Sequence, residues 1–369
     1  MTVNFLPRPY QRTMIDHVLD TPRGALWAGM GTGKTSATLS ALHLLDLIEP
    51  GPALVIAPLR VAQSTWPDEA AKWSQFARMR VQPIVGTRAE REAALRKPAD
   101  IYTINYEQLP WLVEHFAARK WPYRKVVADE ATRLKGFRLR QGAVRAKALA
   151  SIAHKHAVRW INLTGTPAPN GLPDLWGQTW FIDRGHRLGR SFDAFTTRWF
   201  RQHPSGYGID ALPHAQAEIE GALADVCLTI DARDHFDIAA PIVNTIYVEL
   251  PAKARAIYRD MEKQMFAEIE GVGVEAFNAA ARTQKCLQLA NGAAYTDEGA
   301  SEWAEVHDAK LQALESIVNE AAGAPVLVAY NFRSDLARLQ RAFPQGRPLD
   351  SDPQTIRDWN AGRIPLLFA

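Results

Sequence analysis

One glycine-rich turn in this chain of 369 residues combines residue types and spacing that indicate chemistry on a phosphate. Residues Ala28–Thr35 read A-G-M-G-T-G-K-T, between the apolar run Gly24–Ala28 and the helical pattern Ser36–Ile48. In a strand–turn–helix of this kind, backbone N–H groups and the positive end of the helix dipole face the phosphates. The turn residues predicted to cradle them are Gly29, Met30, Gly31, Thr32 and Gly33.

Lys34 and Thr35 complete the predicted phosphate loop. We expect the Lys34 ammonium to reach the β- and γ-phosphates of a nucleotide and the Thr35 hydroxyl to bind Mg²⁺. The strict pattern has Gly where this chain has Ala28. Alanine is small enough for that position if its φ is negative, so the departure weakens the prediction without excluding it. The alternative is a glycine-rich turn that has no function.

Two acids follow a second apolar run, in the string V-V-A-D-E at Val126–Glu130. After a phosphate loop, a strand that ends in Asp-Glu predicts nucleotide hydrolysis. Asp129 would hold Mg²⁺ near Thr35, and Glu130 would polarise the water that attacks the γ-phosphate. The catalytic residues predicted here are therefore Glu130, Asp129 and Lys34. Two solvated acids at the end of a strand are the alternative.

The pattern of apolar runs predicts the fold that positions these residues. Short runs rich in β-branched residues alternate with helical patterns, which favours βαβ units and an α/β fold with a parallel sheet and helices on both faces. Ligands of such sheets bind at the carboxyl ends of the strands, where the residues above fall. The expected strands are Ala25–Ala28, Ala53–Ala57, Val81–Val85, Ile101–Asn105, Lys125–Ala128 and Trp160–Leu163.

Charge and cysteine content add weaker constraints. The net charge is only +3, from 43 basic and 40 acidic residues, so it identifies no class of partner. However, Ala131–Pro173 has no acid and holds several basic residues, among them Arg140, which indicates either a polyanion-binding surface or a solvated helix face. Cys227 and Cys286 form no metal or disulfide pattern. No apolar run approaches the ~18 residues of a membrane span, so we expect a protein of a reducing, cytoplasmic compartment that binds no membrane.

Several strings, taken together and in this order, resemble one family. The chain resembles the superfamily 2 helicase-like ATPases, and among them the Swi/Snf-type double-stranded-DNA translocases, over most of its length. Thr132 departs from the family pattern, where His is usual, whereas a residue other than Gly is common at the position of Ala28. The strings are R-P-Y-Q at Arg8–Gln11, Ala28–Thr35, Ala53–Trp73, T-I-N-Y-E at Thr103–Glu107, D-E-A-T-R-L-K at Asp129–Lys135 and L-T-G-T-P-A-P-N-G-L-P-D-L-W at Leu163–Trp176.

The resemblance implies roles for further residues. Gln11 would read the adenine of ATP, and Mg²⁺ would accompany the nucleotide. Thr164, Gly165 and Thr166 would couple the state of ATP to the grip on double-stranded DNA. Arg60, Thr65 and Asn105 fall at strand ends on the edge of the phosphate loop, where they could donate to DNA phosphates without reading sequence. The residues expected to contact DNA are Arg60, Thr65, Asn105 and Tyr106.

The same resemblance implies two RecA-like lobes. We expect an ATP-binding lobe at 1–184, a less regular, acidic connector or insertion at 185–241, and a partial second lobe at 242–369. Nothing after Pro325 is similar to the family's last two motifs, which supply arginine fingers. We therefore expect a C-terminally truncated motor with weak turnover, related to phage-encoded members and acting in a bacterial or phage-infected cell, where it could associate with the nucleoid.

Three functions remain open on the sequence. The leading one is an ATP-dependent DNA translocase or remodeller. The second is an ATP- and DNA-binding half-motor that needs a partner subunit, and the third is a strand-separating superfamily 2 helicase or a motor subunit of a restriction system. An unrelated P-loop kinase or transporter ATPase would leave Tyr10, Gln11 and Leu163–Trp176 without an explanation.

Overall fold

The chain divides into two compact units, Met1–Ala239 and Ala240–Ala369. The structure, a computed structural model, describes residues 3–139, 144–204, 208–235, 242–270, 276–296, 302–321 and 323–369. Arg140 of the acid-free stretch and residues 236–241 at the end of the expected connector lie outside these ranges.

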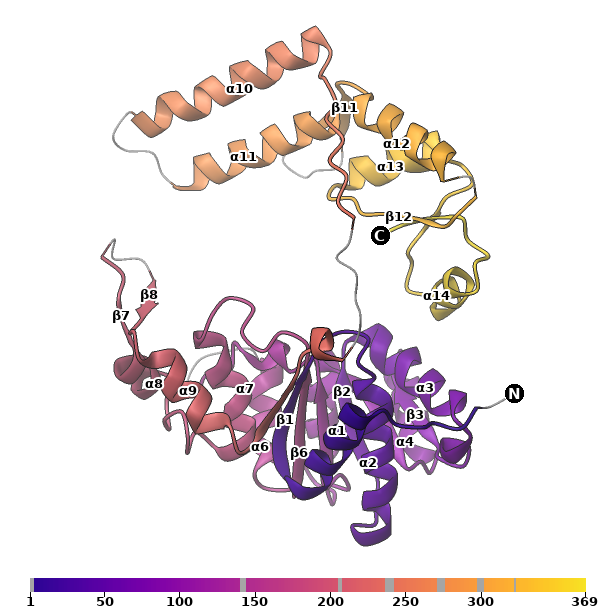
Figure 1. Ribbon diagram of the computed structural model, residues 1–369, viewed down its shortest axis with the longest axis vertical. Helices are drawn as coiled ribbons and strands as arrows, with labels where there is room; N and C mark the ends of the chain where they lie inside the picture. Colours follow the sequence, from indigo (N-terminus) through magenta and orange to yellow (C-terminus); the bar gives the residue numbers. More distant parts are fainter. Residues whose placement is uncertain are drawn as a thin grey trace. The chain divides into compact units, whose positions relative to one another are not determined.

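A seven-stranded parallel sheet forms the centre of the first unit (Figure 1). Its strand order is β3-β4-β2-β5-β6-β1-β9, and every pairing is parallel. The predicted α/β class is confirmed, and six of the strands lie where the apolar runs placed them. The strands are β1 (Arg23–Ala28), β2 (Ala53–Ala57), β3 (Val81–Ile84), β4 (Ile101–Asn105), β5 (Lys125–Asp129), β6 (Arg159–Thr164) and β9 (Cys227–Ile230).

Both faces of the sheet are covered, which explains why the central strand β2 is apolar without interruption. In β2, Leu54 and Ile56 join one buried cluster, whereas Val55 joins the cluster on the other face. The second of these clusters includes residues of α1 (Pro9–Asp20), α2 (Lys34–Ile48) and α3 (Trp66–Lys72). The first includes residues of α4 (Arg88–Arg96), α5 (Leu109–His115), α6 (Val144–Ala153), α7 (Pro173–Asp183), α8 (Phe192–Trp199) and α9 (Ala215–Leu223).

Short turns of helix follow several strands. A π-helical turn, η1 (Val61–Thr65), leads into α3, and 3-10 turns continue the chain after β4 and β5. These turns carry chain from the carboxyl edge of the sheet, so they border the predicted site. The 3-10 turns are η2 (Ser74–Phe76), η3 (Tyr106–Gln108), η4 (Ala131–Leu134) and η5 (Ala232–Asp234).

The described residues of the expected connector, up to residue 235, belong to the first unit. β9 pairs in parallel with β1 and thereby forms one edge of the sheet. Its short run of four residues follows an acidic helical segment, which is why the sequence pattern did not indicate a strand. The hairpin β7 (Phe200–Gln202) and β8 (Ile209–Ala211) lies in the same segment.

The second unit begins with two helices that lie side by side, α10 (Ala252–Glu270) and α11 (Ala276–Asn291) (Figure 1). A small parallel sheet follows, made of β12 (Val326–Val328), β13 (Arg347–Pro348) and β14 (Leu366–Phe368) in the order β12-β14-β13. Its buried cluster holds Leu339, Phe343, Leu366 and Phe368. The remaining elements are β10 (Ala293–Tyr295), β11 (Trp303–Glu305), α12 (Ala309–Glu320), α13 (Arg333–Ala342) and α14 (Pro353–Asn360).

Both cysteines are free thiols. Burial raises the pKa of the Cys227 thiol to about 12. Across the described ranges, none of the helices has the length and apolar character that a bilayer span requires.

Candidate functional site

Three neighbouring strands bring the predicted catalytic residues to one edge of the sheet. β6 pairs with β5 on one side and with β1 on the other, so the ends of all three strands meet. A cavity of about 560 Å³ opens at this edge. Its lining includes the phosphate-loop residues Met30, Gly31, Gly33, Lys34 and Thr35, together with Gln11, Asp129 and Glu130.

The phosphate loop has the backbone conformation that its glycines predict. Gly31 and Gly33 have φ of +77° and +78°, in the left-handed region that glycine adopts without steric cost. The Thr32 hydroxyl donates to the Gly29 carbonyl over 2.8 Å and closes the turn. Because α2 begins at Lys34, its N-terminus faces the loop, and this arrangement is able to hold the phosphates of a nucleotide.

The Lys34 ammonium lies inside the loop. It donates to the carbonyl oxygens of Ala28 (2.6 Å) and Gly29 (3.0 Å). An ammonium has three N–H donors, so one remains for a phosphate oxygen. Burial lowers the pKa of Lys34, and the nearby charges of Asp129 and Glu130 act in the opposite direction.

Asp129 is buried and is oriented by two donors. Its Oδ2 accepts the indole N–H of Trp66 (2.9 Å), and its Oδ1 accepts the backbone N–H of Glu130 (3.0 Å). Burial raises the pKa of Asp129, while the hydrogen bond from Trp66 and the charge of Lys34 lower it. A carboxylate offers about four lone-pair positions, so Asp129 retains acceptor capacity for Mg²⁺.

Glu130 has an unusual backbone conformation. Its φ and ψ are both 54°, a left-handed conformation that costs a non-glycine residue about 1–2 kcal/mol. Such strain is concentrated at functional sites. Glu130 is half-buried and lines the cavity, where a carboxylate is able to polarise an attacking water.

Gln11 links the first helix to the phosphate loop. Its Nε2 donates to the Thr32 carbonyl over 3.0 Å, and its Oε1 accepts the Arg8 backbone N–H over 2.9 Å. The expected adenine-reading residue therefore lines the same cavity as the phosphate loop. Tyr10 lines the same cavity and stacks on His235 with ring centroids 4.7 Å apart.

The expected coupling segment lies close to the backbone of the phosphate loop. Thr164 is buried, and its hydroxyl accepts the backbone N–H of Thr166 over 3.2 Å. A Cβ added to Gly165 would lie 3.5 Å from the Ala28 carbonyl oxygen, so the two segments are in van der Waals proximity. The phosphate loop and Thr164–Thr166 therefore lie side by side at this edge of the sheet.

The four residues expected to contact DNA fall into two groups. Thr65 is exposed and Arg60 is half-buried, and Thr65 also lines the cavity at the phosphate loop. Asn105 is 6% exposed and donates to the Glu107 carboxylate over 2.9 Å. Tyr106 is fully buried, and its hydroxyl donates to the Asp129 carbonyl over 2.8 Å. In this structure the Tyr106 ring has no exposed surface and its hydroxyl supports the backbone of Asp129, so a contact between Tyr106 and DNA stays a prediction.

Several cations of the acid-free stretch pair with acids outside it. Arg133 and Arg145 both bind the Glu107 carboxylate, at 3.1 and 3.3 Å. Arg159 is buried and binds Glu49 over 2.8 Å. Lys135 pairs with Asp174. These cations therefore have structural partners, and the charge count alone overstates the surface available to a polyanion.

Two residues of the site are not singled out by the sequence patterns. Trp66 is fully buried, and its indole N–H also holds Asp129. Glu69 accepts the Ser36 hydroxyl and the Trp73 indole N–H on the same oxygen, each over 2.7 Å, and it lines the cavity. The spacing of Trp66, Glu69 and Trp73 places them on one face of a helix, which was the available signal.

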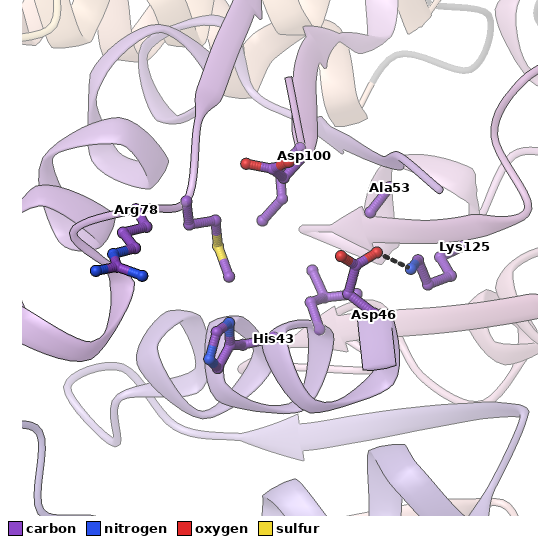
Figure 2. A pocket seen from close by; sticks show the side chains of 9 residues that line it. His43, Asp46, Ala53, Arg78, Asp100 and Lys125 are labelled. Carbon is purple, nitrogen blue, oxygen red and sulfur yellow. Dashed lines mark hydrogen bonds and ion pairs between the residues drawn. The ribbon is translucent and has the colours of Figure 1, made fainter. Parts of the chain in front are cut away.

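A second, smaller cavity of about 190 Å³ lies at the opposite edge of the sheet, near the starts of β2, β4 and β5. Figure 2 shows Lys125 turned towards Asp46, to which it donates over 3.2 Å. The Lys125 ammonium also donates to the Glu49 carbonyl, and Asp100 is bound by Arg80. This cavity holds none of the predicted catalytic residues.

Comparison with known protein families shows to which family this chain belongs. The SNF2-related domain family matches residues 10–291, more than half of the chain. The chain belongs to this family. The expected Swi/Snf relationship is thereby confirmed, and the first unit is an SNF2-type, helicase-like ATPase domain.

Individual relatives agree with membership of the SNF2-related family. The chain is 57% identical over 372 residues to "Putative protein p41" of Acyrthosiphon pisum secondary endosymbiont phage 1, covering 99% of this chain and 80% of the phage protein. It is 33% identical over 256 residues to "Transcription regulatory protein SNF2" of Saccharomyces cerevisiae, which covers 68% of this chain but 13% of the yeast protein.

A solved structure supports the fold. The Sulfolobus solfataricus SWI2/SNF2 ATPase core in complex with dsDNA superposes with a TM-score of 0.52 at 19% identity. The match covers 100% of this chain and 78% of the archaeal one. At this identity the likeness concerns the fold, which is that of an SNF2 ATPase core.

Proposed function

We propose that this protein hydrolyses ATP and uses the reaction to move along double-stranded DNA. The observation that carries the proposal is the meeting of Lys34, Asp129 and Glu130 at one cavity, beside Thr164–Thr166. A nucleotide-hydrolysing site would need each of these parts. The DNA-bound state of the archaeal relative and the phage origin of the p41 relative support double-stranded DNA as partner and a bacterial or phage-infected cell as setting.

Each residue of the site has a role in this proposal. Lys34 and the N–H groups of the loop bind the β- and γ-phosphates, and Gln11 lies where the adenine of ATP would be read. Thr35 and Asp129 would hold Mg²⁺, which supplies charge neutralisation for the phosphate oxygens. Glu130 orients and polarises the water that attacks the γ-phosphate.

The DNA-binding part of the proposal rests on fewer residues. Arg60 and Thr65 would donate to backbone phosphates, which position a protein on a duplex without reading its sequence. Thr164, Gly165 and Thr166 would transmit the state of the nucleotide to that contact. Asn105, whose amide is engaged by Glu107, would reach a phosphate only after that hydrogen bond opens.

A pair of variants tests the hydrolytic site. Lys34→Ala should abolish ATP binding, whereas Glu130→Gln should bind ATP like the native chain and lose hydrolysis by about 10²–10⁴-fold. Lys155→Ala changes an exposed lysine away from the cavity and serves as the control. Calorimetry gives the affinity, and phosphate release gives the rate. Full ATP affinity in Lys34→Ala would refute the site.

Movement on DNA needs a separate experiment. ATPase rates with and without duplex DNA measure stimulation, displacement of a third strand from a triplex measures translocation, and a forked duplex measures strand separation. We expect stimulation and triplex displacement without fork opening. Arg60→Ala should weaken DNA binding uniformly across sequences and reduce the slope of log affinity against log salt by about one.

A further inference from the structure

Trp66 makes a contact that packing alone does not require. The side chain is fully buried, and its indole N–H points at Oδ2 of Asp129, 2.9 Å away. Partners that hydrogen-bond a metal-binding side chain fix its orientation, and their loss commonly weakens metal affinity 10- to 100-fold. Asp129 is held at two further atoms, by the Glu130 N–H at Oδ1 and by the Tyr106 hydroxyl at its backbone carbonyl.

The turn that precedes Trp66 sets the direction of its side chain. In η1, the Trp66 N–H donates to the Val61 carbonyl, five residues back, so the turn contains one residue more than an α-helical turn. One extra residue rotates the following side chains by about 100°. The Ala62 carbonyl, which an α-helix would have paired with Trp66, instead accepts the Thr103 hydroxyl over 2.5 Å.

π-helical turns are rare and are found frequently at functional sites. Here the turn begins after Arg60 and ends at Thr65, the two accessible residues for which we proposed contacts with DNA phosphates. Trp66 follows directly. A small shift of this turn would therefore move the indole that orients Asp129.

We propose that Trp66 is a positioning residue that orients Asp129 towards nucleotide-bound Mg²⁺, and that η1 makes this orientation responsive to DNA. The inference rests on the proposed function in that it takes ATP–Mg²⁺ as the ligand of the cavity. It assigns to Trp66 a role in the metal site, in addition to its place in the hydrophobic core.

The test measures binding rather than turnover. Affinity for a non-hydrolysable ATP analogue is titrated against Mg²⁺, and once more in EDTA. Trp66→Phe should raise the Mg²⁺ concentration needed for half-maximal enhancement roughly tenfold or more and leave the affinity in EDTA unchanged. Trp199→Phe is the matched control, because its buried indole also donates to a carboxylate, that of Glu218 over 2.9 Å.

A second variant covers the risk that Trp66→Phe fails to fold. Benzothienylalanine at position 66 keeps the shape of the ring and lacks the N–H, so it should reproduce the Mg²⁺ shift. An unchanged Mg²⁺ requirement in either folded variant overturns the positioning role. If the native chain binds the analogue without any Mg²⁺ dependence, the proposed function and this inference fail together. If it binds with Mg²⁺ dependence but never translocates, the inference on Asp129 stands alone.

Repeating the Mg²⁺ titration with duplex DNA tests the proposed link through η1. The duplex should lower the Mg²⁺ requirement of the native chain and have little effect in Trp66→Phe. An equal effect of DNA on both chains, or none on the native chain, overturns the link through η1.

Discussion

The side-chain amide of Gln11 occupies the space into which a side chain on Gly33 would project. Gln11 is 8% exposed, and both ends of its amide are engaged, Nε2 by the Thr32 carbonyl and Oε1 by the Arg8 N–H. The amide therefore has little freedom to move aside. This relationship explains why Gly33, the last residue before α2, must be small as well as left-handed.

Gly33→Ala should destabilise the chain more than Gly31→Ala. Both glycines have left-handed φ, so each substitution costs about 1–2 kcal/mol of backbone strain. Among the described residues, nothing lies within 4 Å of a Cβ added to Gly31, whereas the Cβ of Gly33→Ala would meet Gln11. We expect an additional loss of about 1 kcal/mol or more in Gly33→Ala, measured by denaturant unfolding without nucleotide.

A double mutant identifies the cause. Adding Gln11→Ala to Gly33→Ala should recover part of the excess loss, which makes the two substitutions non-additive. Equal destabilisation by Gly31→Ala and Gly33→Ala would show that the Gln11 side chain moves aside at little cost in free energy.

A second pair of glycines tests the packing of α7 against η4. A Cβ on Gly177 would lie 2.5 and 2.6 Å from the backbone carbonyls of Lys135 and Leu134. Gly177→Ala should therefore destabilise the chain by about 1–3 kcal/mol, although alanine is the better helix former. In the described structure the Cβ of Gly221→Ala, in α9, would meet nothing within 4 Å, so this control should stabilise by about 0.5–1 kcal/mol. Thermal unfolding distinguishes the two, and a stabilised Gly177→Ala would contradict the close approach.

The sequence patterns determined much of the sheet, because six of its strands are apolar runs followed by turn or helix signals. The patterns also predicted that the phosphate loop and Asp129 lie at one edge of the sheet, because the carboxyl ends of parallel strands meet there. The same patterns do not predict contacts between residues that are far apart in the sequence. Trp66 and Asp129 are 63 residues apart, and nothing in the local pattern distinguishes an indole that packs from one that also donates.

The same limit applies to charge and burial. The sequence shows that the stretch Ala131–Pro173 contains no acid. It does not show that cations of this stretch form ion pairs with acids in other segments, such as Glu107 and Glu49. Tyr106 follows a strand, as an accessible residue would, and yet the ring is enclosed by the first unit. The edge strand β9 has only four residues and has polar residues near both ends, so the periodicity of the sequence does not distinguish it from a loop.

Tyr106→Phe should affect catalysis more than stability. It removes the hydroxyl that donates to the Asp129 carbonyl and leaves the buried ring in place, at a cost of about 1 kcal/mol. Tyr102→Phe is a matched control, because it removes a hydroxyl that donates to the Lys97 carbonyl over 2.6 Å. Both variants should unfold at similar temperatures, while Tyr106→Phe alone should lower the rate of ATP hydrolysis. Equal hydrolysis rates would show that the backbone of Asp129 does not depend on Tyr106.

The stability of the first unit should rise with pH through the range in which histidines titrate. Burial lowers the pKa of His17 and of His154 below the ordinary value of 6.5. The unfolded chain therefore binds more protons than the folded chain as the pH falls below 6.5, and the free energy of unfolding falls with it. His17 has a physical reason for this behaviour, since burial outweighs the hydrogen bonds with the backbone of Val226 and Ala25, which raise its pKa.

The pH window separates histidines from carboxylates. The hydrogen bond with Arg159 is the main cause that lowers the pKa of Glu49. The stability that this carboxylate contributes is therefore lost only as the pH falls through and below 4.5. Denaturant unfolding between about pH 5.5 and 8 thus reports the histidines. His17→Gln and His154→Gln should each flatten the slope of unfolding free energy against pH, and the double variant should flatten it further. A slope that stays the same in the double variant would assign the pH dependence to other groups.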